Sequence, residues 1–281
     1  MLVLKLVLTP VIIGGVTLVG RRHGPRVAGL AVGLPLTTGP VSAFLAAERE
    51  AAFAIRAAAG AVVGLIGAAV FCATYAGVAR RREWPVALGA ATVAIAATTL
   101  LLTGLGAAAL PLPVVVALAI ATMILLWAGG ARLVPVGQPR TPAPRAETPV
   151  WDLPARMAVS TAMVAALTAA APLLGSRLSG VLSAMPVFSG VLGVFTHRHE
   201  GRAAAVAMLR GTVIGCVSGV LFFAVVGEAA APGRLVATYA AAALLSVVAG
   251  VVVSHLTRPR LPARLATDAG DDERRPTWRA A

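Results

Sequence analysis

The sequence predicts an all-α, polytopic membrane helix bundle with nine transmembrane helices in an inverted 4+1+4 repeat. Three observations support this: long apolar runs, arginines gathered between those runs, and similarity of the two halves. Of the 281 residues, 58% are hydrophobic and 12% are charged, and the mean hydropathy is +0.88. Because a water-soluble chain carries about 25% charged residues, most of this protein's exterior must face lipid.

Nine apolar runs approach the roughly 20 residues that a helix needs to cross a bilayer. They lie at residues 2 to 20, 27 to 47, 57 to 78, 86 to 106, 108 to 129, 157 to 174, 178 to 196, 203 to 227 and 235 to 256. The fourth and fifth runs are joined by Gly and Pro residues, which predict a tight helical hairpin. The first run is followed by Arg21 and Arg22 without a small-residue cleavage pattern, so we interpret it as a retained helix.

Basic residues are distributed unequally between the two sets of loops that nine crossings produce. Fifteen arginines before the distal tail fall on one face: Arg21, Arg22, Arg26, Arg80, Arg81, Arg82, Arg132, Arg140, Arg145, Arg156, Arg198, Arg202, Arg258, Arg260 and Arg264. Five basic residues fall on the other: Lys5, Arg49, Arg56, Arg177 and Arg234. The positive-inside rule predicts a bacterial cytoplasmic membrane protein with its N-terminus outside and its C-terminus in the cytoplasm.

The formal net charge of +13 would suggest nucleic acid binding in a soluble protein. Here the arginines lie between apolar runs, so we interpret them as topology signals and expect no nucleic-acid partner. Cys72 and Cys216 both lie inside apolar runs, which offers neither a disulfide framework nor a CxxC metal site.

Composition divides the chain into five parts. Residues 1 to 106 form the first four-helix repeat, 107 to 130 a connecting transmembrane helix, and 131 to 155 a Pro-rich cytoplasmic linker. Residues 156 to 256 form the second, inverted four-helix repeat. Residues 257 to 281 carry mixed charge and are interpreted as a disordered cytoplasmic tail.

The two halves match without a gap at an offset of 151 residues. Between residues 24 to 71 and 175 to 222, twelve of 48 positions are identical. The matched pairs include Arg26/Arg177, Pro35/Pro186, Gly39/Gly190 and Phe71/Phe222. This offset spans five crossings, an odd number, so the second copy enters the membrane from the opposite side. Inverted repeats of this kind build many secondary transporters.

The stretch from Ala28 to Pro40 reads Ala-Gly-Leu-Ala-Val-Gly-Leu-Pro-Leu-Thr-Thr-Gly-Pro and precedes a short charged loop and a Gly-rich helix. It resembles the small four-helix bacterial inner-membrane proteins of the GlpM type, over the second and third helices of each half. The resemblance implies two such units fused through an extra helix. It implies a fold and no catalytic residues.

The second helix of each half is interrupted by Pro and Gly, which remove a backbone donor and ease unwinding. Non-helical backbone at this depth survives where it is buried in protein or lines a wet cavity. One interpretation is a midplane binding site made from two opposed broken helices, and the other is a pair of kinks packed by small residues. The candidate substrate-binding residues are Pro35, Thr37, Thr38, Gly39, Ser183, Pro186, Ser189, Gly190 and Arg210.

Arg210 is a candidate because it lies roughly 10 Å inside its helix. A charge at that depth needs a partner from another helix, an anionic ligand, or a side chain that snorkels to the headgroups.

Two further patterns are assigned structural roles. Glycines at spacings of three or four predict a close packing seam between the third and eighth helices; they are Gly60, Gly64, Gly67, Gly211, Gly215 and Gly219. The segment from His197 to Glu200 is interpreted as a solvated juxtamembrane loop, because its ligand spacing matches zinc sites poorly.

No nucleophile and base pair or buried carboxylate pair is found in the apolar runs, so no enzyme activity, metal or cofactor is expected. The sequence predicts a transporter- or channel-like integral membrane protein for a small solute or lipid-like molecule. The alternative is a non-transporting scaffold or accessory subunit of envelope assembly. Membrane lipids are expected partners, and a homo-oligomer is compatible with the sequence.

Overall fold

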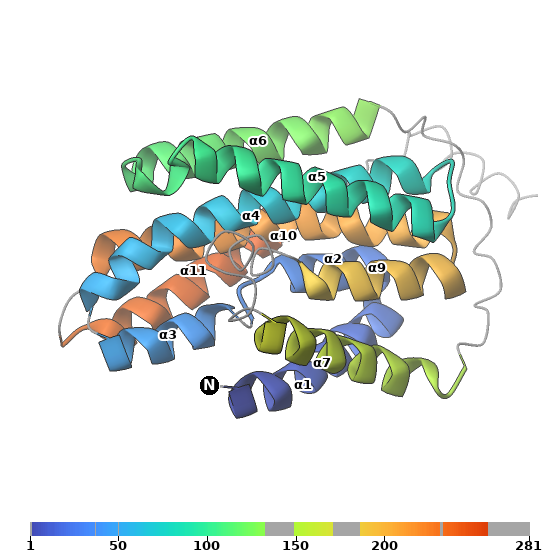
Figure 1. Ribbon diagram of the computed structural model, residues 1–281, viewed down its shortest axis with the longest axis horizontal. Helices are drawn as coiled ribbons and strands as arrows, with labels where there is room; N and C mark the ends of the chain where they lie inside the picture. The colour runs from blue at the N-terminus through green and yellow to red at the C-terminus, as the bar shows by residue number, and fades with distance from the viewer. Residues whose placement is uncertain are drawn as a thin grey trace, which may run out of the picture.

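The computed structural model describes residues 2–36, 38–49, 51–132, 149–170, 186–230 and 233–257. Within these ranges the chain is almost entirely α-helical and forms no strand, which confirms the all-helical prediction. The helices are α1 (Leu2–His23), α2 (Pro25–Gly33), α3 (Thr38–Arg49), α4 (Ala51–Ala79), α5 (Trp84–Gly104), the short 3-10 helix η1 (Ala107–Ala109), α6 (Leu112–Arg132), α7 (Asp152–Ala170), α9 (Val187–His199), α10 (Arg202–Ala229) and α11 (Leu235–Leu256) (Figure 1).

Five helical segments of the described chain are long and apolar enough to cross a membrane, by length and composition. They are Ala57–Ala79, Trp84–Gly104, Leu112–Gly130, Arg202–Ala229 and Leu235–Leu256. These segments correspond to the predicted third, fourth, fifth, eighth and ninth runs. The finding fits an integral membrane protein. The predicted hairpin is confirmed as well, because α5 and α6 are joined by a short turn that contains η1.

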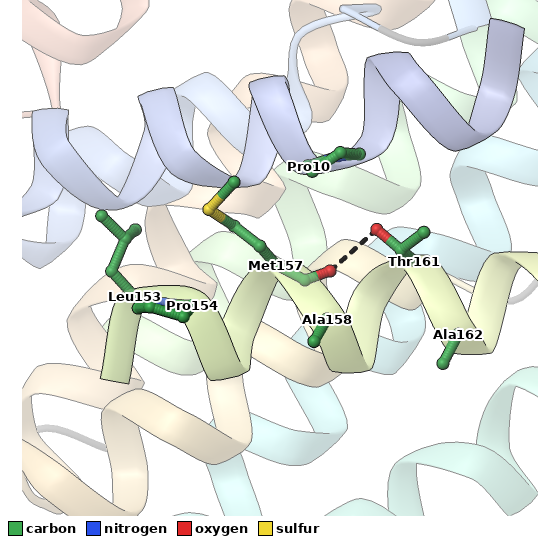
Figure 2. Close-up of a pocket in the computed structure, with 7 residues that line it drawn as sticks. All are labelled: Pro10, Leu153, Pro154, Met157, Ala158, Thr161 and Ala162. Atoms are coloured by element: carbon green, nitrogen blue, oxygen red, sulfur yellow. Dashed lines mark hydrogen bonds between the residues drawn. The ribbon is translucent and has the colours of Figure 1, made fainter. Parts of the chain in front are cut away.

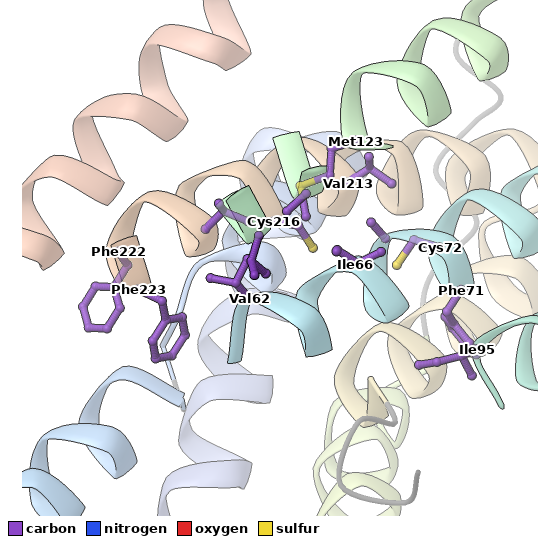
Figure 3. Packing of buried hydrophobic residues seen from close by; sticks show 14 of the residues in the cluster. Val62, Ile66, Phe71, Cys72, Ile95, Met123, Val213, Cys216, Phe222 and Phe223 are labelled. Atoms are coloured by element: carbon purple, nitrogen blue, oxygen red, sulfur yellow. The ribbon is translucent and has the colours of Figure 1, made fainter. Parts of the chain in front are cut away.

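Helices α4 and α10 lie side by side at the centre of the bundle and run antiparallel (Figure 1). Position Gly227 of α10 lies against Ala58 of α4, and Gly219 lies against Leu65. Apolar side chains of both helices, together with Ile95 of α5 and Met123 of α6, form one buried cluster (Figure 3).

Burial differs sharply between the central and the outer helices. The apolar window of α10 is 72% buried, whereas that of α6 is 17% buried. The outer helices α5, α6 and α11 expose large side chains such as Val93, Leu125 and Leu244. A monomer in water rarely exposes so extensive an apolar surface, so the outer helices suit a lipid environment.

The bounds of several helices repeat at the offset of the two halves. Arg202 begins α10 151 residues after Ala51 begins α4, and Leu235 begins α11 151 residues after Trp84 begins α5. Helices α1 and α7 are equivalent at the same offset to within one residue at their starts. They also run antiparallel, because the last turn of α1 contacts the first residue of α7.

The glycine seam of the bundle lies between α2 and α10, not between α4 and α10 as predicted. A Cβ placed on Gly33 would lie 2.5 Å from the backbone of Gly215, and one on Gly29 would overlap the carbonyl oxygen of Met208. By contrast, a Cβ on Gly60 or Gly64 would meet no atom of the described residues within 4 Å.

The prediction that Gly60, Gly64 and Gly67 of α4 form a close seam with α10 is therefore wrong. Helix α4 does pack closely on α10, but it does so through larger side chains such as Val62 and Ile66. Gly67 faces Ile95 of α5. Of the three glycines predicted on α10, which are Gly211, Gly215 and Gly219, only Gly219 contacts α4, through Leu65. A stripe of small residues predicts a close approach of two helices without saying which neighbour approaches.

Candidate functional site

The chain breaks between α2 and α3, where the sequence predicts an interruption. Helix α2 ends at Gly33, and Leu34 takes an extended conformation with φ −65° and ψ 150°. Helix α3 begins at Thr38. In the second half, residues 171–185 lie outside the described residues, and α9 begins directly after Pro186.

Helices α3 and α9 begin in the same way. The backbone N–H of Gly39 donates to the carbonyl oxygen of Pro35 at 2.9 Å, and that of Gly190 donates to Pro186 at 2.9 Å. Proline is well suited to the start of a helix because its missing N–H would have no partner there. Pro35 and Pro186 therefore hold equivalent positions in the two halves.

The glycine four residues after each proline, Gly39 or Gly190, contacts an aromatic ring from the other half of the chain. A Cβ on Gly39 would lie 3.2 Å from Cζ of Phe222, and a Cβ on Gly190 would lie 3.6 Å from Cζ of Phe71. The two glycines and the two phenylalanines are each separated by 151 residues. Such reciprocal contacts, in which i meets j and j meets i, are typical of units related by a two-fold axis.

The first break lies near the middle of the central helix pair. The end of α2 is level with Gly215, close to the midpoint of α10, and Gly219 is level with Leu65 near the midpoint of α4. Val32 of α2 and Phe188 of α9 pack against the same buried cluster, and the two helices are in contact.

The predicted site residues fall into three groups. The first group lies at the starts of α3 and α9. Pro35 and Pro186 are half-buried, Thr38 is exposed, and Gly39 and Gly190 are buried. Ser189 is also buried and forms a hydrogen bond with the Cys72 thiol. Thr37 and Ser183 lie outside the described residues. Arg210 belongs to a different place, near the end of α6, because its Nε lies 3.9 Å from a Cβ placed on Gly130.

Ser218 is a polar residue near the first break that sequence reasoning missed. It is completely buried on α10, and its hydroxyl has no hydrogen-bond partner among the described residues. A Cβ on Gly250 of α11 would lie 2.9 Å from Ser218 Oγ and 3.7 Å from Leu34 Cδ2. The hydroxyl therefore lies where α10, α11 and the break converge. The matching residue in the first half is Gly67, so the repeat offered no paired signal.

Comparison with protein-family models, curated proteins and solved structures finds no match for this chain. The GlpM-type resemblance therefore stays a prediction. The function has to be argued from the geometry of the chain itself.

A buried ionic cluster joins α1, α7 and α9 at one end of the bundle. Asp152, the first residue of α7, is fully buried and contacts Arg156 Nε at 2.9 Å, His199 Nδ1 at 2.7 Å and Arg21 Nη2 at 3.1 Å. Arg156 also donates from Nη2 to Glu200 Oε1 at 3.2 Å. Burial alone would raise the pKa of Asp152, but the charge of Arg156 and hydrogen bonds from His199, Arg156 and Arg21 hold it below its usual range.

This cluster corrects two interpretations from the sequence. The sequence counts Arg156 among the arginines of the cytoplasmic loops, whereas in the structure it is 3% exposed. The sequence predicts a solvated loop at His197 and His199, but both belong to the last turn of α9, and their side chains contact different partners. His197 is buried beside Tyr75, with 3.4 Å between Nδ1 and the phenol oxygen, and burial lowers its pKa although Glu83 partly raises it.

The sequence feature that could have predicted this ionic cluster is the i,i+4 spacing of Asp152 and Arg156 at the start of a helix. The other partners come from helices far away in the chain.

An apolar groove of about 660 Å³ runs between α1 and α7 (Figure 2). It is lined by Pro10, Leu153, Pro154, Met157, Ala158, Thr161 and Ala162. The Thr161 hydroxyl donates to the Met157 carbonyl oxygen at 2.8 Å, so its polarity is satisfied within the helix. The lining offers apolar surface and no ionisable side chain, which suits an acyl chain better than a polar solute.

Proposed function

We propose that this chain crosses the bacterial cytoplasmic membrane nine times as an inverted 4+1+4 repeat and moves a small solute or lipid-like molecule. The two central breaks would form the binding site. The observation that carries the proposal is the reciprocal contact of Gly39 with Phe222 and Gly190 with Phe71. Opposed halves of similar structure provide outward-open and inward-open states of similar energy.

The direction of equivalent helices also supports an inverted repeat. Helices α4 and α10 occupy equivalent places at the offset of 151 residues and run antiparallel, as do α1 and α7. A parallel duplication would make equivalent helices run in the same direction. A two-fold axis in the membrane plane reverses them.

One end of the bundle gathers the arginines and is proposed to face the cytoplasm. Three contacts bring helix ends together there: Arg21 with Asp152, Arg202 with Glu83, and Arg26 with Thr257. They join the end of α1 to the start of α7, the start of α10 to the turn after α4, and the start of α2 to the end of α11. Under this placement the N-terminus lies outside.

The topology is tested with two cysteines in equivalent turns of the halves. In a chain carrying Cys72→Ala and Cys216→Ala, we expect Arg234→Cys to react with a membrane-impermeant maleimide in intact cells. Arg82→Cys should react only after permeabilisation. Both side chains are exposed and are separated by nearly the repeat offset, so the two sites differ mainly in the side of the membrane. Equal labelling of both in intact cells contradicts the inverted arrangement.

The binding site is tested by water access to the first break. We expect Thr38→Cys in the same background to react with a charged thiosulfonate, because a transport site opens to water from at least one side. The matched control is Val93→Cys, which lies at the middle of α5 and is 69% exposed on an outer helix. Lipid should protect it, so exposure alone does not produce reaction.

If Thr38→Cys reacts no faster than Val93→Cys from either side, the break is a packing feature. The scaffold or accessory-subunit alternative then becomes the better account. A stoichiometric partner that co-purifies with the protein would add to that account.

A further inference from the structure

The apolar groove between α1 and α7 begins beside the buried ionic cluster. Its first lining residue on α7, Leu153, follows Asp152, which contacts Arg21 of α1 at 3.1 Å. Its last lining residue, Ala162, lies nine residues further along α7, or roughly 13 Å at 1.5 Å per residue. Half of a hydrocarbon core of roughly 30 Å is about 15 Å. The groove is therefore about as long as one leaflet is deep.

The lining of the groove is open on one side and apolar. Met157 extends from α7 toward α1, and its sulfur lies 3.5 Å from a Cβ placed on Gly14 (Figure 2). Pro154, Ala158 and Ala162 are exposed along the same helix. Among the described residues, the lining leaves no polar side chain unsatisfied. An open apolar groove of this kind suits a flexible hydrocarbon chain.

Helix α1 adds a stripe of exposed side chains beside the groove. Val7, Val11 and Leu18 are each more than half exposed, and spacings of four and seven residues place them on one face of the helix. Arg22 follows Leu18 by four residues and continues this face into the last turn. An apolar stripe that ends in an exposed arginine is typical of a helix that lies against acyl chains and ends among headgroups.

The charges at this end of the groove leave Arg22 without a carboxylate. Asp152 and Glu200 balance Arg21 and Arg156 within the ionic cluster. Arg22 is exposed, and no carboxylate of the described residues pairs with it. Its guanidinium can therefore donate to an external anion, and phosphate oxygens fit such donors well.

Trp151 indicates where the membrane surface lies at this end. It directly precedes Asp152 and is more than half exposed, and its ring lies edge to face with the ring of His199, with 5.4 Å between centroids. Tryptophan is enriched where acyl chains meet headgroups. The arginines at the end of α1 and the first residues of the groove therefore lie at headgroup depth, and the rest of the groove extends toward the midplane.

We propose that the groove between α1 and α7 binds an acyl chain of an anionic phospholipid whose phosphate lies against Arg22 and the exposed part of Arg21. Burial of the chain gives affinity, and the positive charge selects the anionic headgroup. The inference rests on the proposed membrane crossings of α1 and α7 and on the cytoplasmic placement of this end, but it does not require transport.

The acyl-chain contact is tested on the full-length protein in detergent by native mass spectrometry, with equal amounts of phosphatidylglycerol and phosphatidylcholine. We expect phosphatidylglycerol to be retained in preference. Ala158→Trp fills the groove and should reduce its retention by about tenfold or more, since displacing two methylene groups already corresponds to about tenfold. Ala97→Trp is the matched control because Ala97 is exposed on the outer helix α5, and it should leave retention unchanged.

The headgroup contact is tested by Arg22→Gln. We expect this variant to weaken retention of phosphatidylglycerol by about fivefold, as for the loss of one basic residue near an anionic headgroup, and to leave phosphatidylcholine unchanged. Arg22→Lys should keep most of the preference. Arg82→Gln is the matched control, since Arg82 is an exposed arginine in the turn between α4 and α5, and it should behave as the wild type.

Equal retention of the two lipids by the wild type would overturn the proposal. Equal losses in Ala158→Trp and Ala97→Trp, or in Arg22→Gln and Arg82→Gln, would overturn it too, because a diffuse lipid layer or basic surface would then explain binding. A dimer that dissociates in Ala158→Trp without loss of lipid would overturn it and assign the groove to a second copy of the chain. None of these outcomes depends on the reactivity of Thr38→Cys, so failure of the lipid site and failure of the transport proposal are distinguishable.

Discussion

Replacing Gly215 by alanine is expected to destabilise the protein strongly, whereas the same change at Gly64 is expected to be neutral or slightly stabilising. A Cβ on Gly215 would overlap the carbonyl oxygen of Leu30 and lie 2.7 Å from Cα of Gly33. Both are backbone atoms, so α2 and α10 would have to separate. Overpacking of this kind costs about 1–3 kcal/mol, and loss of the seam places Gly215 at the upper end of that range.

Gly64 is the matched control because it holds the equivalent position in the first repeat. Among the described residues a Cβ there would meet nothing within 4 Å, and replacing a helical glycine by alanine gains roughly 0.5–1 kcal/mol. Thermal unfolding of the purified protein in detergent, followed by tryptophan fluorescence, measures both variants. Equal midpoints for Gly215→Ala and Gly64→Ala would contradict the seam between α2 and α10.

The second large effect is expected for Asp152→Asn. The change removes the one negative charge that binds Arg21, Arg156 and His199 together, and leaves the buried Arg156 with Glu200 alone. Breaking a buried ion pair by removing one partner costs about 3–5 kcal/mol. We expect the loss to separate α1 and α7 first, since Arg21 is their charged contact.

Glu83→Gln is the control for this prediction. It also removes a carboxylate from an ion pair, but Glu83 and Arg202 are 69% and 46% exposed, so the cost should stay below about 1 kcal/mol. The comparison uses the thermal midpoint in the same detergent. Similar midpoints for the two variants would show that the buried cluster does not hold the helix ends.

The effect of Asp152 should depend on pH in a defined direction. Its pKa is lowered in the folded protein, so its contribution is complete above the unfolded carboxyl pKa of about 3.9. The contribution is lost as the pH falls from there through the folded pKa. The midpoints of wild type and Asp152→Asn should therefore differ at neutral pH and converge below about pH 4.

Several features of the fold were predictable because their causes are local. Proline at position 35 removes a backbone donor and prevents continuous helix, and the structure breaks between Gly33 and Thr38. The Gly and Pro residues after position 103 predict the turn between α5 and α6, which is present. Long apolar runs predict spans, and five such helices are found in the described chain.

The candidate site was predictable only in part. Pro35 and Pro186 do stand where the helices resume, and their equivalence followed from the repeat in the sequence. The contacts of Gly39 and Gly190 with rings of the opposite half did not follow from it. Arg210 was predicted to belong to the same site, whereas the structure places it near the end of α6.

The sequence by itself determined which segments are helical, where a helix must break, and which helix ends carry positive charge. Each of these depends on residues within a few positions of one another, through hydrogen bonding of the backbone and transfer of side chains from water. The tertiary structure alone decided that Gly211 and Gly215 face α2, and that Asp152 meets Arg21 and His199. Those partners lie far apart in the chain, and which face one helix presents to another depends on the packing of the whole bundle.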